Sequence, residues 1–299
     1  MARSMTKSAL KLAQLSFQVA QESLPAYAHK FSPKRYTQHQ LFAILVLRQF
    51  FKTDYRGIVV LLDEWSELRS RLGLKQMPNY STLCYAEQRL MTQPMFEQIL
   101  YQTIEQAQAQ KLIHQPSDLA VDATGLETHH ASRYYIKRQG QGHNSRYAWL
   151  KLSLACHLAS HLFAGAVASQ GPSQDSPQFA PGMHQATQQL TWTGLLADAG
   201  YDAEHNHRLC RERLGIPTTL IALNKRGAGR KWPKTTYRRQ MKRNFAKTRY
   251  NQRWHIESAI ARHKRRLGTI IQARSLAAQL REGYLRVITH NLMILPNVA

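Results

Sequence analysis

The sequence predicts an α/β protein in which an all-α N-terminal domain precedes a mixed five-stranded sheet flanked by helices. Two observations predict this fold class. From Leu10 to Ile113 the apolar residues recur at three- and four-residue spacing, and after Pro116 short apolar or alternating runs replace that pattern. We therefore expect a helical domain at residues 1–115 and a sheet-containing domain at residues 116–299.

Two helices stand out in the N-terminal region. One runs from about Tyr55 to Leu72 and is ended by Gly73, and the next follows Ser81, a good N-cap, and runs to about Leu90. A helix pair with a short link and a capped second helix is typical of helix-turn-helix DNA readers. The same pattern also suits simple bundle packing, so both interpretations stay open.

Five strands are expected after the boundary. The first, residues 119–121, is a short apolar run that leads into Asp122, and the second alternates apolar and polar side chains over residues 150–154. The others are expected at residues 163–167, 193–197 and 218–223, with helices opening after Asp175, spanning residues 203–214 and lying on either side of Gly268. This order of strands and helices is that of ribonuclease-H-like domains.

The charge balance indicates a polyanionic partner. Lysine and arginine total 41 against 18 acids, which gives a net charge of +23. Such an excess is hard to keep soluble unless a polyanion neutralises it, and nucleic acid is the expected partner. Hydrophobic residues reach 43%, which argues against a basic chain without a core. Charge alone predicts binding and not chemistry.

The cysteines and the apolar runs indicate a cytoplasmic protein. Cys84, Cys156 and Cys210 are scattered and odd in number, so they suggest neither a disulfide framework nor a structural zinc site. The longest purely apolar run, residues 41–47, is too short to span a membrane, and the N-terminus has no pattern of a signal peptide. We expect no membrane association.

One acid stands out in a strongly basic segment. Residues 225–266 contain 16 lysines and arginines and a single acid, Glu257. An ion pair with Arg253, one turn earlier, is the simplest explanation. On a continuous helix, however, Tyr250, Arg253, Glu257 and Lys264 fall within a stripe about 60° wide. That face would carry a carboxylate, two cations and a phenol.

Asp122 and Asp198 are the natural companions of Glu257. Each ends a short apolar strand, Leu-Ala-Val-Asp and Leu-Leu-Ala-Asp, and strand ends are where a sheet presents side chains to a crevice. A turn or cap role explains either aspartate alone. Three carboxylates brought together could instead hold a divalent metal ion against a phosphate.

These residues resemble the catalytic set of bacterial insertion-sequence transposases of the Asp-Asp-Glu (DDE) class. The matching motifs are Asp122 in V-D-A-T-G, Asp198 in A-D-A-G-Y-D, and the run Y-x2-R-x3-E-x6-K from Tyr250 to Lys264. The last is similar to the tyrosine-arginine-glutamate-lysine signature of these enzymes. Glu257 follows Asp198 by 59 residues, which leaves little room for the strand-rich insertion that some members carry there.

The resemblance implies a DNA transposase that binds the terminal inverted repeats of an insertion sequence, cleaves the DNA ends and joins their 3′ hydroxyls to target DNA. It implies that Asp122, Asp198 and Glu257 bind two Mg²⁺ ions, for which Mn²⁺ can substitute. It also implies double-stranded DNA as partner, a homodimer in the synaptic complex, and a place at the bacterial nucleoid. DNA contacts are expected from Tyr250, Arg253, Lys264, Trp232, Arg262 and Arg265.

Four further residues suit simpler roles. Asp175 and Asp202 are expected to cap the helices that follow them. His157 and His161 have the i, i+4 spacing of a metal pair but lack a matching glutamate, so zinc is not expected. For Trp232, anchoring a loop is an alternative to stacking on a base.

Three other classes of protein remain open. His205-x-x-Arg208 followed by Tyr284 superficially resembles the nucleophile set of a tyrosine recombinase. A DNA-binding protein that has kept the fold without the activity is the second class. A nuclease or junction resolvase with the same metal chemistry is the third, because the same carboxylates serve both hydrolysis and strand transfer.

Overall fold

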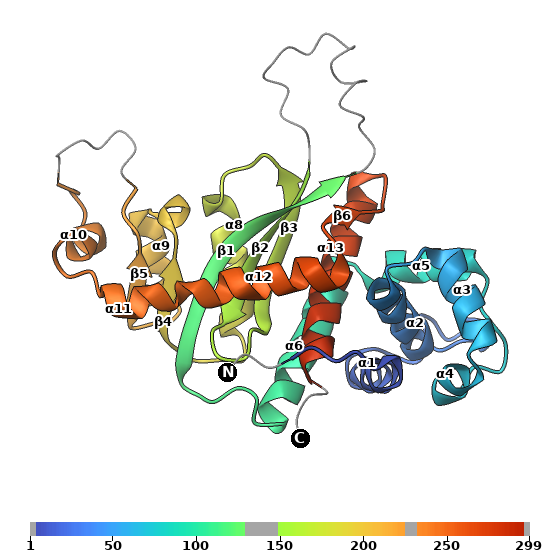
Figure 1. The fold of residues 1–299 in the computed structure, drawn as a ribbon. Coiled ribbons are helices and arrows are strands. Elements are labelled where there is room, and N and C mark those ends of the chain that lie inside the picture. Colours follow the sequence, from blue (N-terminus) through green and yellow to red (C-terminus); the bar gives the residue numbers. More distant parts are fainter. Residues whose placement is uncertain (1–3, 129–148, 225–231, 296–299) are drawn as a thin grey trace, which may run out of the picture. The chain divides into compact units, whose positions relative to one another are not determined.

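The computed structural model describes residues 4–128, 149–224 and 232–295 (Figure 1). The described residues form two compact units. One comprises residues from 113 to 262, and the other comprises residues 4–112 together with residues 263–295. The junction after Leu112 lies close to the expected boundary at residue 115. The C-terminal segment, in contrast, groups with the N-terminal helices, so the compact units and the domains expected from the sequence divide the chain differently.

The helical unit consists of the N-terminal helices and the C-terminal helix. Its elements are α1 (Ala9–Ser23), α2 (Gln38–Phe51), α3 (Tyr55–Glu64), α4 (Ser66–Arg71), α5 (Tyr80–Leu90), α6 (Gln93–Ala109), the short strand β6 (Ile270–Ile271) and α13 (Leu276–Ile294). The core helix α2 contacts α1, α5 and α13, which explains why nearly all its residues are buried. Within the described parts of the chain, no helix is long and apolar enough to cross a membrane.

The two helices expected in the N-terminal region differ in detail from the structure. The helix expected from residue 55 to 72 is interrupted at Trp65, whose φ of −99° and ψ of 84° lie outside the helical region. The next helix begins at Tyr80 and is capped by Asn79, whose side chain accepts the N–H of Ser81 at 3.0 Å. Ser81 is therefore inside the helix and is not its cap.

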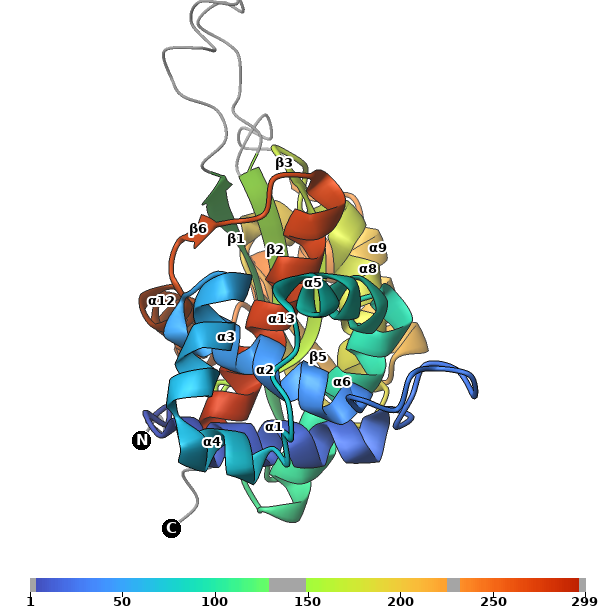
Figure 2. The same cartoon turned by 90° about the vertical axis from the view of Figure 1, so that its right-hand side faces the viewer.

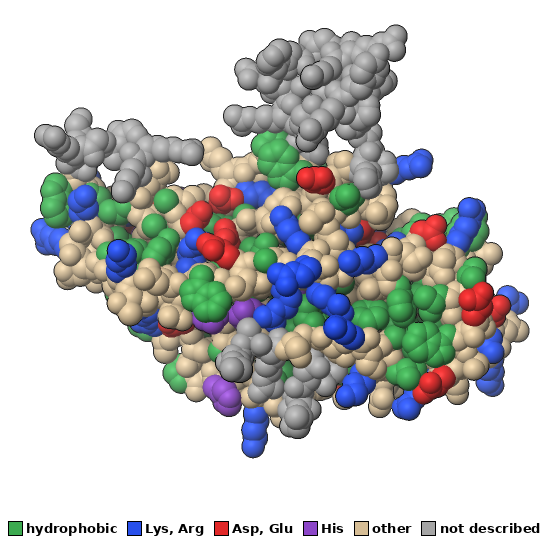
Figure 3. All heavy atoms as spheres, in the orientation of Figure 1, with side chains coloured by type: hydrophobic (Ala, Val, Ile, Leu, Met, Phe, Trp, Pro, Cys, Tyr) green, Lys and Arg blue, Asp and Glu red, His purple; other side chains and the backbone are tan. Residues whose placement is uncertain are grey.

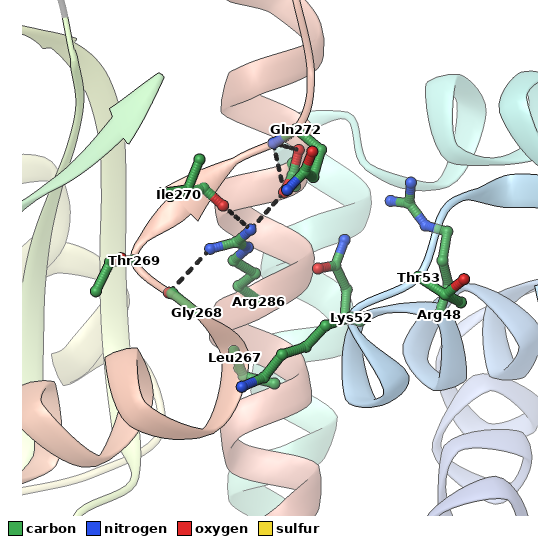
Figure 4. Close-up of a pocket in the computed structure, with 11 residues that line it drawn as sticks. Arg48, Lys52, Thr53, Leu267, Gly268, Thr269, Ile270, Gln272 and Arg286 are labelled. Atoms are coloured by element: carbon green, nitrogen blue, oxygen red, sulfur yellow. Dashed lines mark hydrogen bonds and ion pairs between the residues drawn. The ribbon is translucent and has the colours of Figure 1, made fainter. Parts of the chain in front are cut away.

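A buried ion pair on α13 holds the segment that precedes it (Figure 4). Arg286 donates to the carbonyl oxygens of Gly268 and Ile270 and to Oε1 of Glu282, the last at 2.7 Å. Glu282 also accepts the N–H of Gln272 at 3.1 Å. Both side chains are only 3% exposed, and they border a pocket of about 240 Å³. The segment is thus held by a buried ion pair that also hydrogen-bonds to its backbone.

Removing one partner of this pair is expected to destabilise the helical unit. Glu282→Ala leaves a buried guanidinium without its carboxylate, which costs about 3–5 kcal/mol in comparable cases. Chemical denaturation followed by circular dichroism measures the loss. The matched control is Asp63→Ala, which breaks the exposed pair with Arg69 and should change stability by less than about 1 kcal/mol. A loss for Glu282→Ala as small as that of the control would contradict the expectation.

The other unit is built on a mixed sheet. Among the described residues from 113 to 262 the strands are β1 (Ser117–Thr128), β2 (Trp149–His157), β3 (Phe163–Gly171), β4 (Trp192–Ala197) and β5 (Thr218–Ile221), in the order β3-β2-β1-β4-β5. The pairs β1·β2 and β2·β3 are antiparallel, whereas β1·β4 and β4·β5 are parallel. All five overlap the expected runs, which confirms a mixed α/β architecture.

The first strand is longer than the sequence predicted. Only residues 119–121 read as a strand, but β1 continues to Thr128. Beyond Asp122 the strand stays paired with β2, from Asp122 opposite Leu154 to Leu126 opposite Leu150. The pairing partner therefore extends a strand whose own second half is only weakly apolar.

Helices cover both faces of this sheet (Figures 1 and 2). The first half of α12 (Trp254–Leu267) crosses one face, and α8 (Ser176–Thr187) and α9 (Glu204–Arg208) lie on the other. The helix expected at residues 203–214 is α9 followed by a π-helical turn, Leu209–Arg213. The remaining elements are the 3₁₀ turn η1 (Ala199–Tyr201), α10 (Thr236–Arg243), α11 (Lys247–Tyr250) and the 3₁₀ turn η3 (Asn251–Arg253).

Candidate active site

The register of β1 and β4 places Asp122 beside Asp198. These strands are parallel neighbours in which Val121 pairs with Ala197, and the two aspartates follow directly. β4 ends there, and Asp198 turns the chain into η1 by accepting the N–H of Gly200 on its Oδ1 at 2.8 Å. Asp198 is therefore both a cap residue and a strand-end carboxylate next to Asp122.

Arg253 joins Asp122 to Glu257. Its Nη1 lies 3.1 Å from Oδ2 of Asp122, and its Nη2 forms an ion pair with Oε1 of Glu257. Arg253 is the last residue of η3, and Glu257 lies in the first turn of α12. The simple Arg253–Glu257 pair exists, and the same guanidinium also reaches Asp122, which lies inside β1 and not at the strand end expected from the sequence.

Asp122 interacts electrostatically with both Asp198 and Glu257. Burial raises the pKa of Asp122, and the neighbouring charges of Asp198 and Glu257 raise it further, whereas Arg253 opposes them. Burial alone would lower the pKa of Arg253, but the acids outweigh it and the pKa is raised. Burial also raises the pKa of Tyr250, which interacts with Arg253 and with both aspartates. Asp122, Asp198, Glu257, Arg253 and Tyr250 thus form one acidic site.

The donor chemistry of the acidic site fits a divalent cation, although the observed arrangement is not a closed ligand set. Among the residues that the structure describes, no three His, Cys, Asp or Glu side chains are grouped so as to hold a metal ion. The positive charge between Asp122 and Glu257 is supplied by Arg253. Carboxylate oxygens are the ligands that Mg²⁺ takes, and like charges at this spacing favour a cation. An ion bound between Asp122 and Glu257 would take the place of the Arg253 guanidinium.

The remaining residues expected to contact DNA lie elsewhere in the basic segment, residues 225–266. Arg262 and Lys264 are partly exposed, and Arg265 is exposed, all on α12. Trp232 is 56% exposed and its ring lies 5.9 Å from the Arg243 guanidinium. These positions are accessible to a ligand.

A second ion pair, which sequence reasoning missed, directs the chain into the acidic site. Arg249 donates from Nε to Oδ2 of Asp118 at 2.8 Å and from Nη2 to Oδ1 at 2.5 Å. Burial opposes ionisation of Asp118, but the hydrogen bonds from Arg249 and Thr193 outweigh it and lower its pKa. The pair ties α11 to the start of β1, and so orients η3 with Arg253. No sequence pattern links two residues 131 positions apart.

The cap role expected for Asp202 is wrong, whereas Asp175 takes the expected N-cap position without a side-chain capping bond. The N-cap of α9 is Ala203, and Asp202 instead accepts two hydrogen bonds from Arg238, each of 2.8 Å. Asp175 stands at the N-cap of α8, but its side chain makes no capping bond and pairs with Lys151. Both aspartates form ion pairs with cations that are distant in sequence, and a local sequence pattern cannot predict such pairs.

The two histidines with metal-like spacing do not face a common ligand. Nδ1 of His157 lies 2.7 Å from Oγ of Ser160, and Nε2 of His161 lies 3.0 Å from Nδ1 of His255. Burial lowers the pKa of both His157 and His161 to about 4. Both are therefore neutral core residues.

The tyrosine expected for a recombinase is not placed as a nucleophile. Tyr284 is buried in α13, and its ring stacks on Phe96 at 4.2 Å between centroids. A tyrosine that attacks DNA must reach the phosphate, and a stacked core side chain does not. The geometry therefore disfavours a tyrosine recombinase.

The comparison with known families assigns the chain to a family. Residues 113–292 match the family model described as a transposase DDE domain, which is more than half of the chain. The chain belongs to this family, and its class of enzyme is a transposase. Members of the family generally use divalent metal ions. No curated protein matches the sequence.

Proposed function

We propose that this protein is a cut-and-paste DNA transposase that binds the terminal inverted repeats of an insertion sequence, cleaves the DNA at the ends and joins the 3′ hydroxyls to target DNA. The observation that supports it most is the convergence of Asp122, Asp198 and Glu257 around Arg253. Asp122 lies within β1, Asp198 directly follows the parallel strand β4, and Glu257 lies in the first turn of α12, so each is held by rigid secondary structure.

The proposal assigns the two functional domains as the sequence suggested. Residues 116–299 would be a ribonuclease-H-like catalytic domain, which the order of antiparallel and then parallel strands supports. Residues 1–115 would bind DNA. The helix α5 supports this role, because Tyr85, Gln88 and Arg89 are exposed on it and all carry hydrogen-bonding groups.

Asp122, Asp198 and Glu257 would hold two Mg²⁺ ions, for which Mn²⁺ can substitute, and these would activate the attacking oxygen and stabilise the leaving oxygen. The protein's own residues then position the reaction. Strand β1 fixes Asp122, the end of β4 fixes Asp198, and α12 brings Glu257 to them. Once freed from an acid, Arg253 would bind a phosphate of the DNA, with Tyr250 beside it.

Double-stranded DNA is the proposed partner, as both transposon end and target. The basic residues of α10 to α12 would neutralise phosphates, so that affinity falls as salt rises. Pairing two transposon ends requires at least two protomers, and we propose a homodimer in the synaptic complex.

The decisive test supplies DNA ends that are already cut and carry free 3′ hydroxyls. With Mg²⁺ we expect them to be joined covalently to a labelled target duplex, and ends blocked as 3′-deoxy termini should not be joined. A chelator should abolish the product. Hydrolysis without joining would instead indicate a nuclease or junction resolvase. A covalent protein–DNA adduct formed in the chelator would indicate a tyrosine recombinase.

A further inference from the structure

A buried lysine lies on the far side of the sheet from Asp122. Lys151 on β2 is 5% exposed, and its Nζ lies 2.6 Å from Oδ1 of Asp175 and 2.6 Å from the carbonyl oxygen of Ser173. The cross-strand partner of Asp122 is Leu154, three positions from Lys151, so the two side chains leave opposite faces of the sheet. A buried ammonium is costly unless a carboxylate accompanies it, and Asp175 supplies that carboxylate.

The second oxygen of Asp175 faces the turn that holds Asp198. A Cβ placed on Gly200 would lie 2.8 Å from Oδ2 of Asp175 and 3.0 Å from Oδ1 of Asp198. The two carboxylate oxygens are therefore no more than about 6 Å apart, on either side of the same glycine. Since Gly200 also donates its N–H to Asp198, the Asp175 carboxylate rests against the hydrogen-bonded turn itself.

Tyr201, the residue after this glycine, links the same acids. It is 1% exposed, and its ring lies 5.5 Å from that of Phe179 on α8. Burial raises the pKa of Tyr201, and the charges of Asp175, Asp122 and Asp198 raise it further. The Tyr201 hydroxyl therefore interacts electrostatically with Asp175, Asp122 and Asp198.

Packing of α8 fixes where Asp175 lies. A Cβ on Gly165 of β3 would come within 2.3 Å of the carbonyl oxygen of Gly182, so α8 approaches the sheet more closely than a side chain at position 165 would permit. The buried side chain of Gln185 accepts the N–H of Ala166 at 2.8 Å. Because α8 packs closely on β3, Asp175 at the start of α8 is held in a fixed position against the sheet.

We propose that the Lys151–Asp175 ion pair is a positioning element of the acidic site, which supports the Asp198 turn from the opposite face of the sheet and favours a divalent cation beside Asp198. Asp175 acts through the turn and through its charge, and Lys151 holds it in place. The inference rests on the proposed function, because it concerns the cation that the acids would bind. Residues that orient ligands in this way change metal affinity or activity by about 10–100-fold when they are altered.

Three variants of the full-length chain test the pair in different ways. Asp175→Asn removes the charge but keeps the shape, and it leaves the ammonium of Lys151 without a carboxylate. The double variant Lys151→Gln, Asp175→Asn removes both charges and so avoids an unpaired buried ion. Gly200→Ala keeps every charge but adds a methyl group between the two carboxylates. The probe is Mn²⁺ alone, and electron paramagnetic resonance of the free ion measures its affinity without DNA.

We expect each variant to weaken Mn²⁺ binding by about 10–100-fold and to lower the rate of DNA-end cleavage by a similar factor. Higher Mn²⁺ concentrations should recover part of the cleavage, because the altered group is not itself a proposed ligand. The control variant is Glu282→Ala, which is expected to lose stability in the helical unit but to bind Mn²⁺ as the unaltered protein does. This control separates a loss of stability from a loss of affinity.

The inference fails if the double variant and Gly200→Ala bind Mn²⁺ within twofold of the unaltered protein while Asp198→Asn does not. The pair would then serve stability alone, and the proposed function would stand. If Asp198→Asn itself neither weakens Mn²⁺ binding nor stops cleavage, the proposed function fails and this inference fails with it.

Discussion

Glu257→Gln is expected to reduce cleavage of DNA ends by at least about 10³-fold, the scale on which loss of one member of a cooperating catalytic set acts. Glutamine has nearly the same shape and can still accept a hydrogen bond from Arg253, but it loses the charge that would bind a metal ion. The Glu257 side chain is 54% exposed at the start of α12, so the change should not disturb the core. Affinity for the DNA ends should stay within a few-fold.

A gel assay with end-labelled duplexes measures cleavage, and an electrophoretic shift of the same duplexes measures binding. Glu212→Gln makes the same chemical change at an exposed residue that accepts a hydrogen bond from Tyr237. It should cleave as the unaltered protein does. Cleavage by Glu257→Gln within tenfold of that rate would mean that the carboxylate is not part of the catalytic set. If the protein binds DNA without any enzymatic activity, the two variants should not differ.

Arg253→Met should cost about 10²–10³-fold in cleavage, because the positive charge that contacts the acids, and would contact the scissile phosphate, is lost. The variant should also respond differently to metal ions. Without a divalent cation, Asp122 and Glu257 lose the guanidinium between them and the protein becomes less stable. Adding Mg²⁺ should then raise the thermal midpoint of Arg253→Met more than that of the unaltered protein.

Arg253→Lys gives a graded comparison. Lysine keeps the charge but lacks the planar fork with which Arg253 reaches two carboxylates, so an intermediate loss of cleavage is expected. Arg213→Met serves as the control, since Arg213 is exposed in the π-helical turn Leu209–Arg213, outside the basic helices α10 to α12. Equal Mg²⁺ responses in Arg253→Met and the unaltered protein would show that no ion takes the place of the guanidinium.

Much of the sheet could be predicted from the chain because strands carry a local signal. Apolar or alternating runs located the five strands that the structure describes between residues 113 and 262. The prediction was wrong where the length of an element is set by its pairing with a neighbour and not by its own periodicity. β1 runs on to Thr128 because β2 continues to pair with it, and the helix expected from residue 55 breaks at Trp65.

The candidate site was predictable in its members but not in its contacts. Asp122 and Asp198 could be found because each ends an apolar run, and Glu257 because it is the single acid of a basic segment. The expected continuous helix from Tyr250 to Lys264 is in fact α11, a 3₁₀ turn and α12. Arg253 therefore turns toward Asp122 as well as toward Glu257.

The amino-acid sequence by itself determined the mixed α/β class and the family, and it singled out three acids for the proposed site, because these depend on periodicity and on residue types at short spacing. Only the tertiary structure decided which distant partners meet. Asp118 meets Arg249, Asp202 meets Arg238, and Asp175 meets Lys151, and none of these pairs leaves a local pattern. A charge is satisfied by whichever opposite charge the packed strands and helices bring to it, and that choice is made in three dimensions.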